Sequence, residues 1–239
     1  MSGGFFHTVF YQPIYNVAVF LITILPNHSV ALAVIATTLL VKFALFPLTK
    51  KALITQMKMR DIEPKLEAIR EKYKNDKQAA AVATMQVYKD EGVNPFSSIL
   101  ALFIQLPVIF ALYFIFYKGG FPTIHTADLY SFIHLPTGTV SMEFLMFHMA
   151  EKSWTLALIA GGAQFIQAQL AMPPLPQTNE VSLKNDLARS MNLQMKYIFP
   201  LIIIFISHSL SSVVALYFCV SNIFTIGQEL ALRKHKKAV

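Results

Sequence analysis

The sequence has few charged residues and only one cysteine. Of its 239 residues, 14% are charged, against roughly 25% in an ordinary soluble domain. The apolar share is 55% and the mean hydropathy is +0.51, which excludes a water-soluble globular protein. The single Cys219 excludes an intramolecular disulfide and a metal site built from several cysteines.

The motifs of common catalytic sites are also missing. The chain has no Gly-x-Ser-x-Gly, no His-Glu-x-x-His, no P-loop and no Gly-x-Gly-x-x-Gly. Its Ser-His-Ser at 207–209 has no evident third partner for a catalytic triad. We therefore expect no catalytic residues, no metal, no cofactor and no enzymatic activity. Met1 to Gln12 carries no Lys or Arg, so we expect no cleavable signal and insertion through the mature spans.

Long apolar stretches dominate what is present. A helix needs about 20 apolar residues to cross a hydrocarbon layer of about 30 Å, and the sequence predicts five such spans, at 29–49, 97–118, 153–172, 193–210 and 211–232. The apolar run 14–25 is too short to cross and begins with aromatic residues, so segment 1–28 is expected to hold a helix lying in the interface. Weaker patterns of the same kind fall at 128–134 and 142–149. The predicted class is an all-α membrane protein with five transmembrane helices, a cytoplasmic helical hairpin and an N-terminal interfacial helix.

The positions of the cations predict the orientation. Seventeen of the 20 Lys and Arg residues flank one side of the predicted spans and two flank the other, with Lys42 inside a span. Because cations collect on the cytoplasmic side, we expect an external N-terminus and an external loop 119–152. The hairpin 50–96, the loop 173–192 and the basic tail 233–239 are then cytoplasmic, in a multi-pass protein of the bacterial plasma (inner) membrane.

Segment 50–96 is the only sizeable water-exposed part. Apolar residues recur in it at helical spacing before and after a break at Asn75-Asp76, namely Ile62, Leu66, Ile69 and Tyr73, then Ala79, Val82, Ala83 and Val87. This pattern predicts a two-helix hairpin with one thin apolar seam, expected to be mobile. Pro64 is expected to interrupt and kink its first arm.

Polar residues within the spans gather at one depth. With the predicted orientation, the cytoplasmic half of the bilayer holds Thr38, Lys42, Gln105, Gln164, Gln167, Asn222, Thr225 and Gln228. This bias predicts a water-containing groove that is open to the cytoplasm, closed toward the outside and attractive to anionic groups through Lys42. In an alternative interpretation, Lys42 only extends its ammonium toward the interface. The amides and hydroxyls would then serve only as hydrogen bonds between helices.

Several of these segments match a known family. The sequences KFALFPLTK (42–50) and MKMRDIEPKLEAIREKYK (57–74), then Val93-Asn94-Pro95, Gln105-Leu106-Pro107 and Tyr217 with Ser221-Asn222 closely resemble the YidC/Oxa-type membrane protein insertases. The resemblance covers about residues 10–232, in the form of a bacterial YidC-like protein without the large extracytoplasmic domain. The family usually has arginine where this chain has Lys42, so only the point charge carries over.

The resemblance implies a function and partners. It implies an insertase and chaperone that moves hydrophobic segments of new membrane proteins from a cytoplasmic groove into lipid without ATP, alone or beside the Sec translocon. Nascent membrane proteins and lipids are the implied partners, the ribosome and the Sec translocon are further candidates, and no DNA binding is expected. A small-solute carrier or channel is the alternative, and an intramembrane protease is disfavoured by the missing catalytic dyad.

The resemblance also implies two sets of site residues. The spans 97–118 and 193–210 would border the exit of the substrate toward lipid, through Phe103, Phe110, Phe114, Phe199 and Ile203. The alternative for these apolar residues is ordinary packing against lipid. The hairpin would act in substrate capture, and its candidate residues are Pro64, Leu66, Ile69 and Tyr73.

Overall fold

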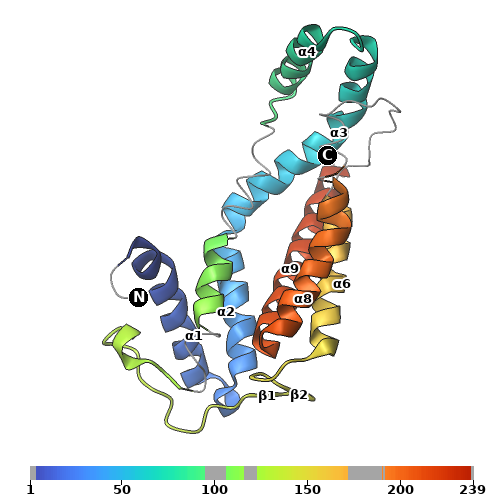
Figure 1. Cartoon of the computed structure of the whole chain (residues 1–239). Coiled ribbons are helices and arrows are strands. Elements are labelled where there is room, and N and C mark those ends of the chain that lie inside the picture. The colour runs from blue at the N-terminus through green and yellow to red at the C-terminus, as the bar shows by residue number, and fades with distance from the viewer. Residues whose placement is uncertain (1–3, 95–105, 116–122, 172–189, 191, 238–239) are drawn as a thin grey trace.

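The structure is a computed structural model that describes residues 4–94, 106–115, 123–171, 190 and 192–237. It is mostly helical (Figure 1), which confirms the all-α class at that level. Its elements are η1 (His7–Tyr11), α1 (Gln12–Ile24), η2 (Pro26–His28), α2 (Val30–Ala44), α3 (Phe46–Lys72), α4 (Lys77–Asp90), η4 (Thr126–Asp128), β1 (Glu143–Phe144), β2 (Phe147–His148), α6 (Trp154–Ala171), η5 (Gln194–Ile198), α8 (Phe199–Ser209) and α9 (Ser212–Lys237). Residues 106–115 add a further helical segment.

Helices α6, α8 and α9 pack closely through small side chains. The buried face of α6 includes Ala157, Ala160 and Gly161, and α6 contacts both α8 and α9 along its length (Figure 1). A Cβ atom added to Gly161 would overlap Ile204 Cγ1 and would lie 2.7 Å from Ile204 Cδ1 and 3.2 Å from the Pro200 carbonyl oxygen. Small residues let helix backbones approach closely in an apolar setting, so Gly161 fixes the distance between α6 and α8.

Helix α1 lies alongside α2 (Figure 1). It buries Tyr15, Val19 and Ile22 in the same apolar core as the first turns of α2. The Asn16 side chain of α1 binds the segment that contains η4. Its Nδ2 donates to the Asp128 carbonyl at 2.9 Å, and its Oδ1 accepts from the Tyr130 N–H at 2.7 Å. The interfacial placement of this segment stays a prediction.

Two weaker helix predictions, at 128–134 and 142–149 in the predicted loop 119–152, are wrong. Only Thr126–Asp128 forms a single 3₁₀ turn near the first expected helix, and 142–149 holds an antiparallel β-hairpin, β1 with β2, rather than a helix. The hairpin turns at Leu145, whose φ of 55° is left-handed. Cross-strand pairing satisfies the backbone groups that a helix would have satisfied along its own axis.

The first predicted span is not one straight helix. Helix α2 ends at Ala44, α3 begins at Phe46, and the two axes are bent by 68° at this break. Pro47 lies in the first turn of α3, where its missing N–H is tolerated but where it cannot continue the preceding helix. The expected interruption at Pro64 is also wrong, since α3 stays helical through it over 27 residues.

The outer faces of the bundle are apolar. Large exposed apolar side chains occur on α2, α6, α8 and α9, among them Leu40, Phe43, Leu158, Ile166, Leu201, Phe205, Ile223 and Leu230. Within the described ranges, one helix, Ser212–Lys234, is long and apolar enough to cross a membrane, and the bent pair of α2 and α3 would count as a second. The expected number of five spans stays a prediction.

Candidate functional site

Lys42 lies in the last turn of α2 and points to α9. Its Nζ donates a hydrogen bond to Thr225 Oγ1 at 3.2 Å. The Thr225 hydroxyl in turn donates to the Ser221 carbonyl at 2.9 Å. A cation in the last turn of a helix is favoured by the partial negative charge of the helix end. The ammonium is therefore held at a fixed place between α2 and α9.

One face of α9 carries the polar residues that surround this ammonium. Asn222, Thr225 and Gln228 follow each other at three-residue steps, which places them on the same side of the helix. Gln228 Nε2 donates to Thr49 Oγ1 of α3 at 3.0 Å. This face of α9 is thus joined both to the end of α2 and to the start of α3.

Helix α6 supplies the opposite wall. Gln164 and Gln167 are one turn apart, and Gln164 Nε2 donates to Gln167 Oε1 at 3.2 Å. Gln164 is buried. Burial of an amide is costly unless its groups are hydrogen-bonded, so the pair is held by its internal bond.

These walls enclose a cavity of about 240 Å³. Its lining combines polar and apolar side chains, namely Lys42, Thr49, Ala52, Leu53, Gln56, Ile109, Gln164, Gln167, Ala168, Ala171, Met195, Phe199, Phe218, Ser221, Asn222, Thr225 and Gln228. None of these lining residues within the described ranges is Asp or Glu. We call this cavity the polar groove. The only ionisable group in its described lining is Lys42, so its field attracts anions.

Six of the eight predicted groove residues meet at the polar groove. They are Lys42, Gln164, Gln167, Asn222, Thr225 and Gln228. Thr38 lies outside it, since it is buried and donates to the Val34 carbonyl of its own helix at 2.7 Å. Gln105 lies outside the described residues. The role of these residues in handling a substrate stays a prediction.

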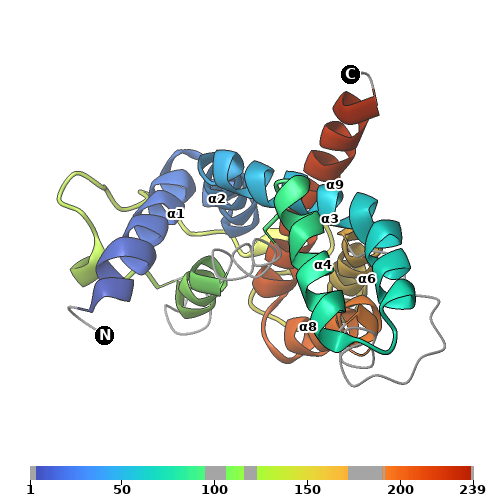
Figure 2. The same cartoon turned by 90° about the horizontal axis from the view of Figure 1, so that it is seen from above.

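Sequence reasoning missed the contribution of α3. Thr49 and Gln56 line the polar groove, because α3 begins directly after the 68° bend that ends α2 beside Lys42. Viewed from above, α3 and α4 overlap the ends of the bundle helices (Figure 2). The sequence signal for this bend is Pro47, because a proline ends one helix and is tolerated in the first turn of the next.

Two arginines fasten this end of the bundle. Arg60 Nη1 of α3 donates to the Leu170 carbonyl at 3.1 Å, and Arg233 Nη2 of α9 donates to the same oxygen. Arg233 also pairs with the buried Glu229 at 2.6 Å. Cationic donors satisfy the free carbonyls at a helix C-terminus, so Leu170 ties α3, α6 and α9 together.

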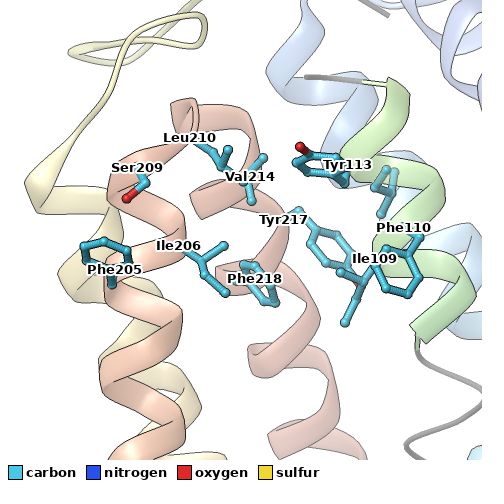
Figure 3. A pocket seen from close by; sticks show the side chains of 11 residues that line it. Ile109, Phe110, Tyr113, Phe205, Ile206, Ser209, Leu210, Val214, Tyr217 and Phe218 are labelled. Carbon is cyan, nitrogen blue, oxygen red and sulfur yellow. The ribbon is translucent and has the colours of Figure 1, made fainter. Parts of the chain in front are cut away.

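An apolar pocket adjoins the polar groove. It has a volume of about 370 Å³ and lies between segment 106–115, α8 and α9, lined by Ile109, Phe110, Leu112, Tyr113, Phe205, Ile206, Ser209, Leu210, Val214, Tyr217 and Phe218 (Figure 3). Ile109 and Phe218 line both spaces. The two cavities are therefore neighbours that share two side chains as a wall.

The five predicted exit residues are distributed over different surroundings. Phe110 is exposed and lines the apolar pocket. Phe114 packs edge-on against Phe6, with ring centroids 6.0 Å apart, and Phe199 lines the polar groove instead. Ile203 is only 3% exposed, so its expected place on an exit surface is wrong. Phe103 lies outside the described residues.

On α8 the exposed positions are one or two residues away from Ile203. Phe205 is 71% exposed and Leu201 is 63% exposed. Phe205 also lines the apolar pocket. Phe205 is therefore an exposed α8 residue that borders the apolar pocket, and the exit role of this surface stays a prediction.

The hairpin of α3 and α4 has a small core of its own. Ile62, Leu66 and Val93 are buried together, with Met59, Val87 and Tyr88 packed around them. Burial raises the pKa of the Tyr88 hydroxyl, as expected for a phenol packed against this core. This core is smaller than that of the helical bundle.

The predicted seam of the hairpin is partly wrong. Ile69 and Tyr73 are only half-buried, and Val82 is 71% exposed. In the first arm, the buried residues of the seam are Ile62 and Leu66. Pro64 is exposed on the outer face of α3.

Three features identify the class of protein. The outer faces are apolar, the buried polar groove holds one cation, and a charged hairpin lies at one end. The chain is a helical membrane protein with an internal polar cavity at the end of the bundle that carries the hairpin. Residues 20–238 match the profile of the family described as 60Kd inner membrane protein. The chain belongs to this family.

Relatives in several bacteria carry the name "Membrane protein insertase YidC". The protein of Clostridium tetani is 30% identical over 210 residues, which cover 87% of this chain and 84% of that protein. The protein of Fusobacterium nucleatum is 29% identical over 205 residues, covering 85% of each chain. The protein of Wolinella succinogenes is 32% identical over 206 residues, covering 86% of this chain and 34% of that longer protein. The chain thus matches most of the length of the shorter relatives and about a third of the longer one.

Proposed function

We propose that this chain inserts newly made membrane proteins into the bacterial inner membrane through the polar groove. One observation carries the proposal: the polar groove around Lys42 and the apolar pocket are neighbours that share Ile109 and Phe218 as a wall. A substrate with a hydrophilic tail and an apolar segment needs a polar and an apolar surface side by side. The names of the relatives support the same role.

In this mechanism, Lys42 and the amides of α6 and α9 lower the cost of bringing the hydrophilic tail partway into the bilayer. Moving a polar tail into hydrocarbon is costly because its groups lose their hydrogen bonds to water. Groups in the polar groove replace part of those bonds. The apolar segment then passes along segment 106–115 and α8, where Phe110 and Phe205 are exposed, and enters the lipid without ATP.

The proposed topology has five spans, an external N-terminus and a cytoplasmic C-terminus. It is supported by the 17 cations that flank one side of the spans against two on the other. The hairpin of α3 and α4 then lies in the cytoplasm beside the mouth of the polar groove and captures the substrate. Nascent membrane proteins are the substrates, and the ribosome and the Sec translocon are proposed partners.

The test is complementation of an insertase-depleted strain, combined with insertion of a single-span reporter. The reporter carries either a neutral or an acidic external tail. We expect Lys42→Arg to retain insertion of both reporters and Lys42→Glu to lose the acidic one, because only the first keeps a positive potential in the polar groove. Equal insertion of the acidic reporter by Lys42→Glu and by the unaltered chain would contradict the electrostatic role.

Two further measurements separate the alternatives. If Lys42 only extends its ammonium to the interface, Lys42→Met inserts every reporter normally; the groove mechanism instead predicts a loss confined to the acidic tail. If the chain is a small-solute channel, vesicles containing it leak a trapped dye. Dye leakage without insertion of either reporter would overturn the insertase function.

A further inference from the structure

The β-hairpin formed by β1 and β2 carries two large apolar side chains at its tip. Leu145 and Met146 are 85% and 84% exposed, whereas Phe144 and Phe147 beside them pack against the core of the helical bundle. Tight turns are usually built from glycine, asparagine, aspartate, proline or serine. Two adjacent apolar side chains at a turn therefore indicate a contact with something outside this chain.

The conformation of the turn does not explain these side chains. Leu145 has a φ of 55°, in the left-handed region that glycine and asparagine adopt readily and that is unusual for leucine. A glycine would form the same turn at a lower conformational cost. Leucine thus costs backbone energy at this position, and an apolar contact of its side chain would offset that cost.

Backbone hydrogen bonds fix the base of the β-hairpin to the ends of two helices. Before β1, the Ser141 carbonyl accepts from the N–H of Val30, the first residue of α2, at 3.0 Å. After β2, the Glu151 carbonyl accepts from the N–H of Ser212, the first residue of α9, at 2.7 Å. The β-hairpin therefore lies at the end of the bundle opposite α4 (Figure 1), at a fixed position along α2 and α9.

The length of α9 places this end of the bundle at the boundary between lipid and water. Its apolar part covers Ser212–Lys234, or about 35 Å at 1.5 Å per residue, against a hydrocarbon layer of about 30 Å. Trp154, in the first turn of α6, is exposed at the same end, and tryptophan collects at this boundary. The base of the β-hairpin is therefore at the level of the lipid headgroups.

Charged side chains surround the base of the β-hairpin. Glu143 and Glu151 are exposed, and His148 lies between them, 3.7 Å from a Glu143 oxygen and 4.0 Å from a Glu151 oxygen. Charged groups enter hydrocarbon only at a high cost, so the base stays in water and only the tip can enter an apolar phase. The neighbouring Lys152 offsets one of the two carboxylates, so the base offers anionic headgroups no net attraction.

We propose that Leu145 and Met146 insert into the lipid leaflet at this end of the bundle and contact its acyl chains. In the proposed topology this is the outer leaflet. The β-hairpin then binds lipid through its apolar tip while Glu143 and Glu151 stay on the water side. Because its base is bonded to α2 and α9, this contact would hold the starts of both helices at a constant depth. It is independent of insertase activity.

The experiment measures the depth of a nitroxide spin label on the full chain in phosphatidylcholine vesicles. Single cysteines in a Cys219→Ser background carry the label: Met146→Cys reports the tip, Glu143→Cys reports the base, and Leu158→Cys on the exposed face of α6 is the control in lipid. Oxygen collides more often with labels in lipid, and a water-soluble nickel chelate collides more often with labels in water. We expect the label at 146 to lie about 5–10 Å deeper than the label at 143, as for apolar faces at an interface.

A charge at the tip tests whether the apolar side chains cause this depth. Leu145→Asp keeps the turn, because aspartate tolerates the left-handed conformation, but it makes entry into lipid costly. In the Met146→Cys chain it should move the label outward to the depth of position 143. An unchanged depth would overturn the proposal.

The other outcomes separate lipid from its alternatives. Addition of phosphatidylglycerol to the vesicles should leave the depth at 146 unchanged, because the contact is apolar; entry only into anionic vesicles would overturn the proposal. Equal access of the nickel chelate to positions 146 and 143 would place the tip in water and would also overturn it. Protection of position 146 from both oxygen and nickel would show a protein contact, such as a second copy of the chain, and would overturn it as well.

Discussion

Adjacent glycines on α6 allow a direct test of the packing between α6 and α8. Gly161 faces α8, where an added Cβ would overlap Ile204 and lie 3.2 Å from the Pro200 carbonyl oxygen. At Gly162 an added Cβ meets nothing within 4 Å in the described part of the chain. The two substitutions to alanine have the same effect on helix propensity and differ only in this contact.

The expected free energies follow from the two contributions. Replacing glycine by alanine inside a helix favours the helix by about 1 kcal/mol, and this gain applies at both positions. Overpacking at a close contact costs about 1–3 kcal/mol, and this cost applies only at Gly161 because the backbone at Pro200 cannot rotate away. We therefore expect Gly162→Ala to be neutral or stabilising and Gly161→Ala to be less stable than Gly162→Ala by about 1–3 kcal/mol.

The measurement is the thermal midpoint of the purified protein in detergent, followed by helical circular dichroism or by a thiol-reactive dye at the buried Cys219. Gly161→Ala should have the lower midpoint of the two variants. A second change, Ile204→Ala, should recover part of the difference by removing the side chain that the new methyl group meets. Equal midpoints for Gly161→Ala and Gly162→Ala would refute the reasoning, because they would show that α6 and α8 do not approach through Gly161.

Three further predictions concern orientation and the hairpin. In a Cys219→Ser background, an impermeant maleimide on intact cells should label Thr137→Cys and not Asn75→Cys, since the cation count places them on opposite sides; labelling of position 75 alone would reverse the topology. Replacing 61–90 with a short flexible linker should leave the protein in the membrane but lower reporter insertion, because the hairpin core is separate from the bundle core. Loss of the protein from the membrane would contradict this prediction. Leu66→Ala should destabilise the hairpin by about 2–5 kcal/mol. Amide hydrogen exchange should then become faster in α4 and stay unchanged in α6. Equal acceleration in both helices would contradict a separate hairpin core.

The helical class and most of the polar groove were predictable from the sequence. Apolar length and cation placement are strong signals, and polar residues are rare enough in the apolar stretches that a shared depth is visible. Lys42 and the polar residues at three-residue steps on α9 fall together for this reason. The pattern needed no knowledge of how the helices are arranged.

The bend at Leu45 was harder to predict because the apolar run continues through it to Leu48. Hydropathy has no term for helix direction, so the run was interpreted as one span and the contribution of Thr49 and Gln56 was missed. Only Pro47 marks the break, and a proline in an apolar stretch is also compatible with a mild kink.

The inner and outer faces of α8 could not be told apart either. Residues 201–206 are all apolar, yet Ile203 is buried while Phe205 is exposed. In water, one face of a helix is polar and the alternation reveals the core. Against lipid, both faces are apolar, and only the neighbouring helices decide which face is covered.

The break between α2 and α3 makes α3 a lever with its fulcrum at Leu45. At 1.5 Å per residue, α3 is about 40 Å long, Thr49 lies about 6 Å from the fulcrum and Arg60 about 22 Å from it. A rotation of about 10° would then move Thr49 by about 1 Å, Arg60 by about 4 Å and the far end by about 7 Å. The Arg60 end of the bond to the Leu170 carbonyl would therefore be displaced about four times as far as the Thr49 end of the bond to Gln228. A movement of the hairpin tip would thus displace the contact of α3 with α6 at Arg60 more than the contact of α3 with α9 at Thr49.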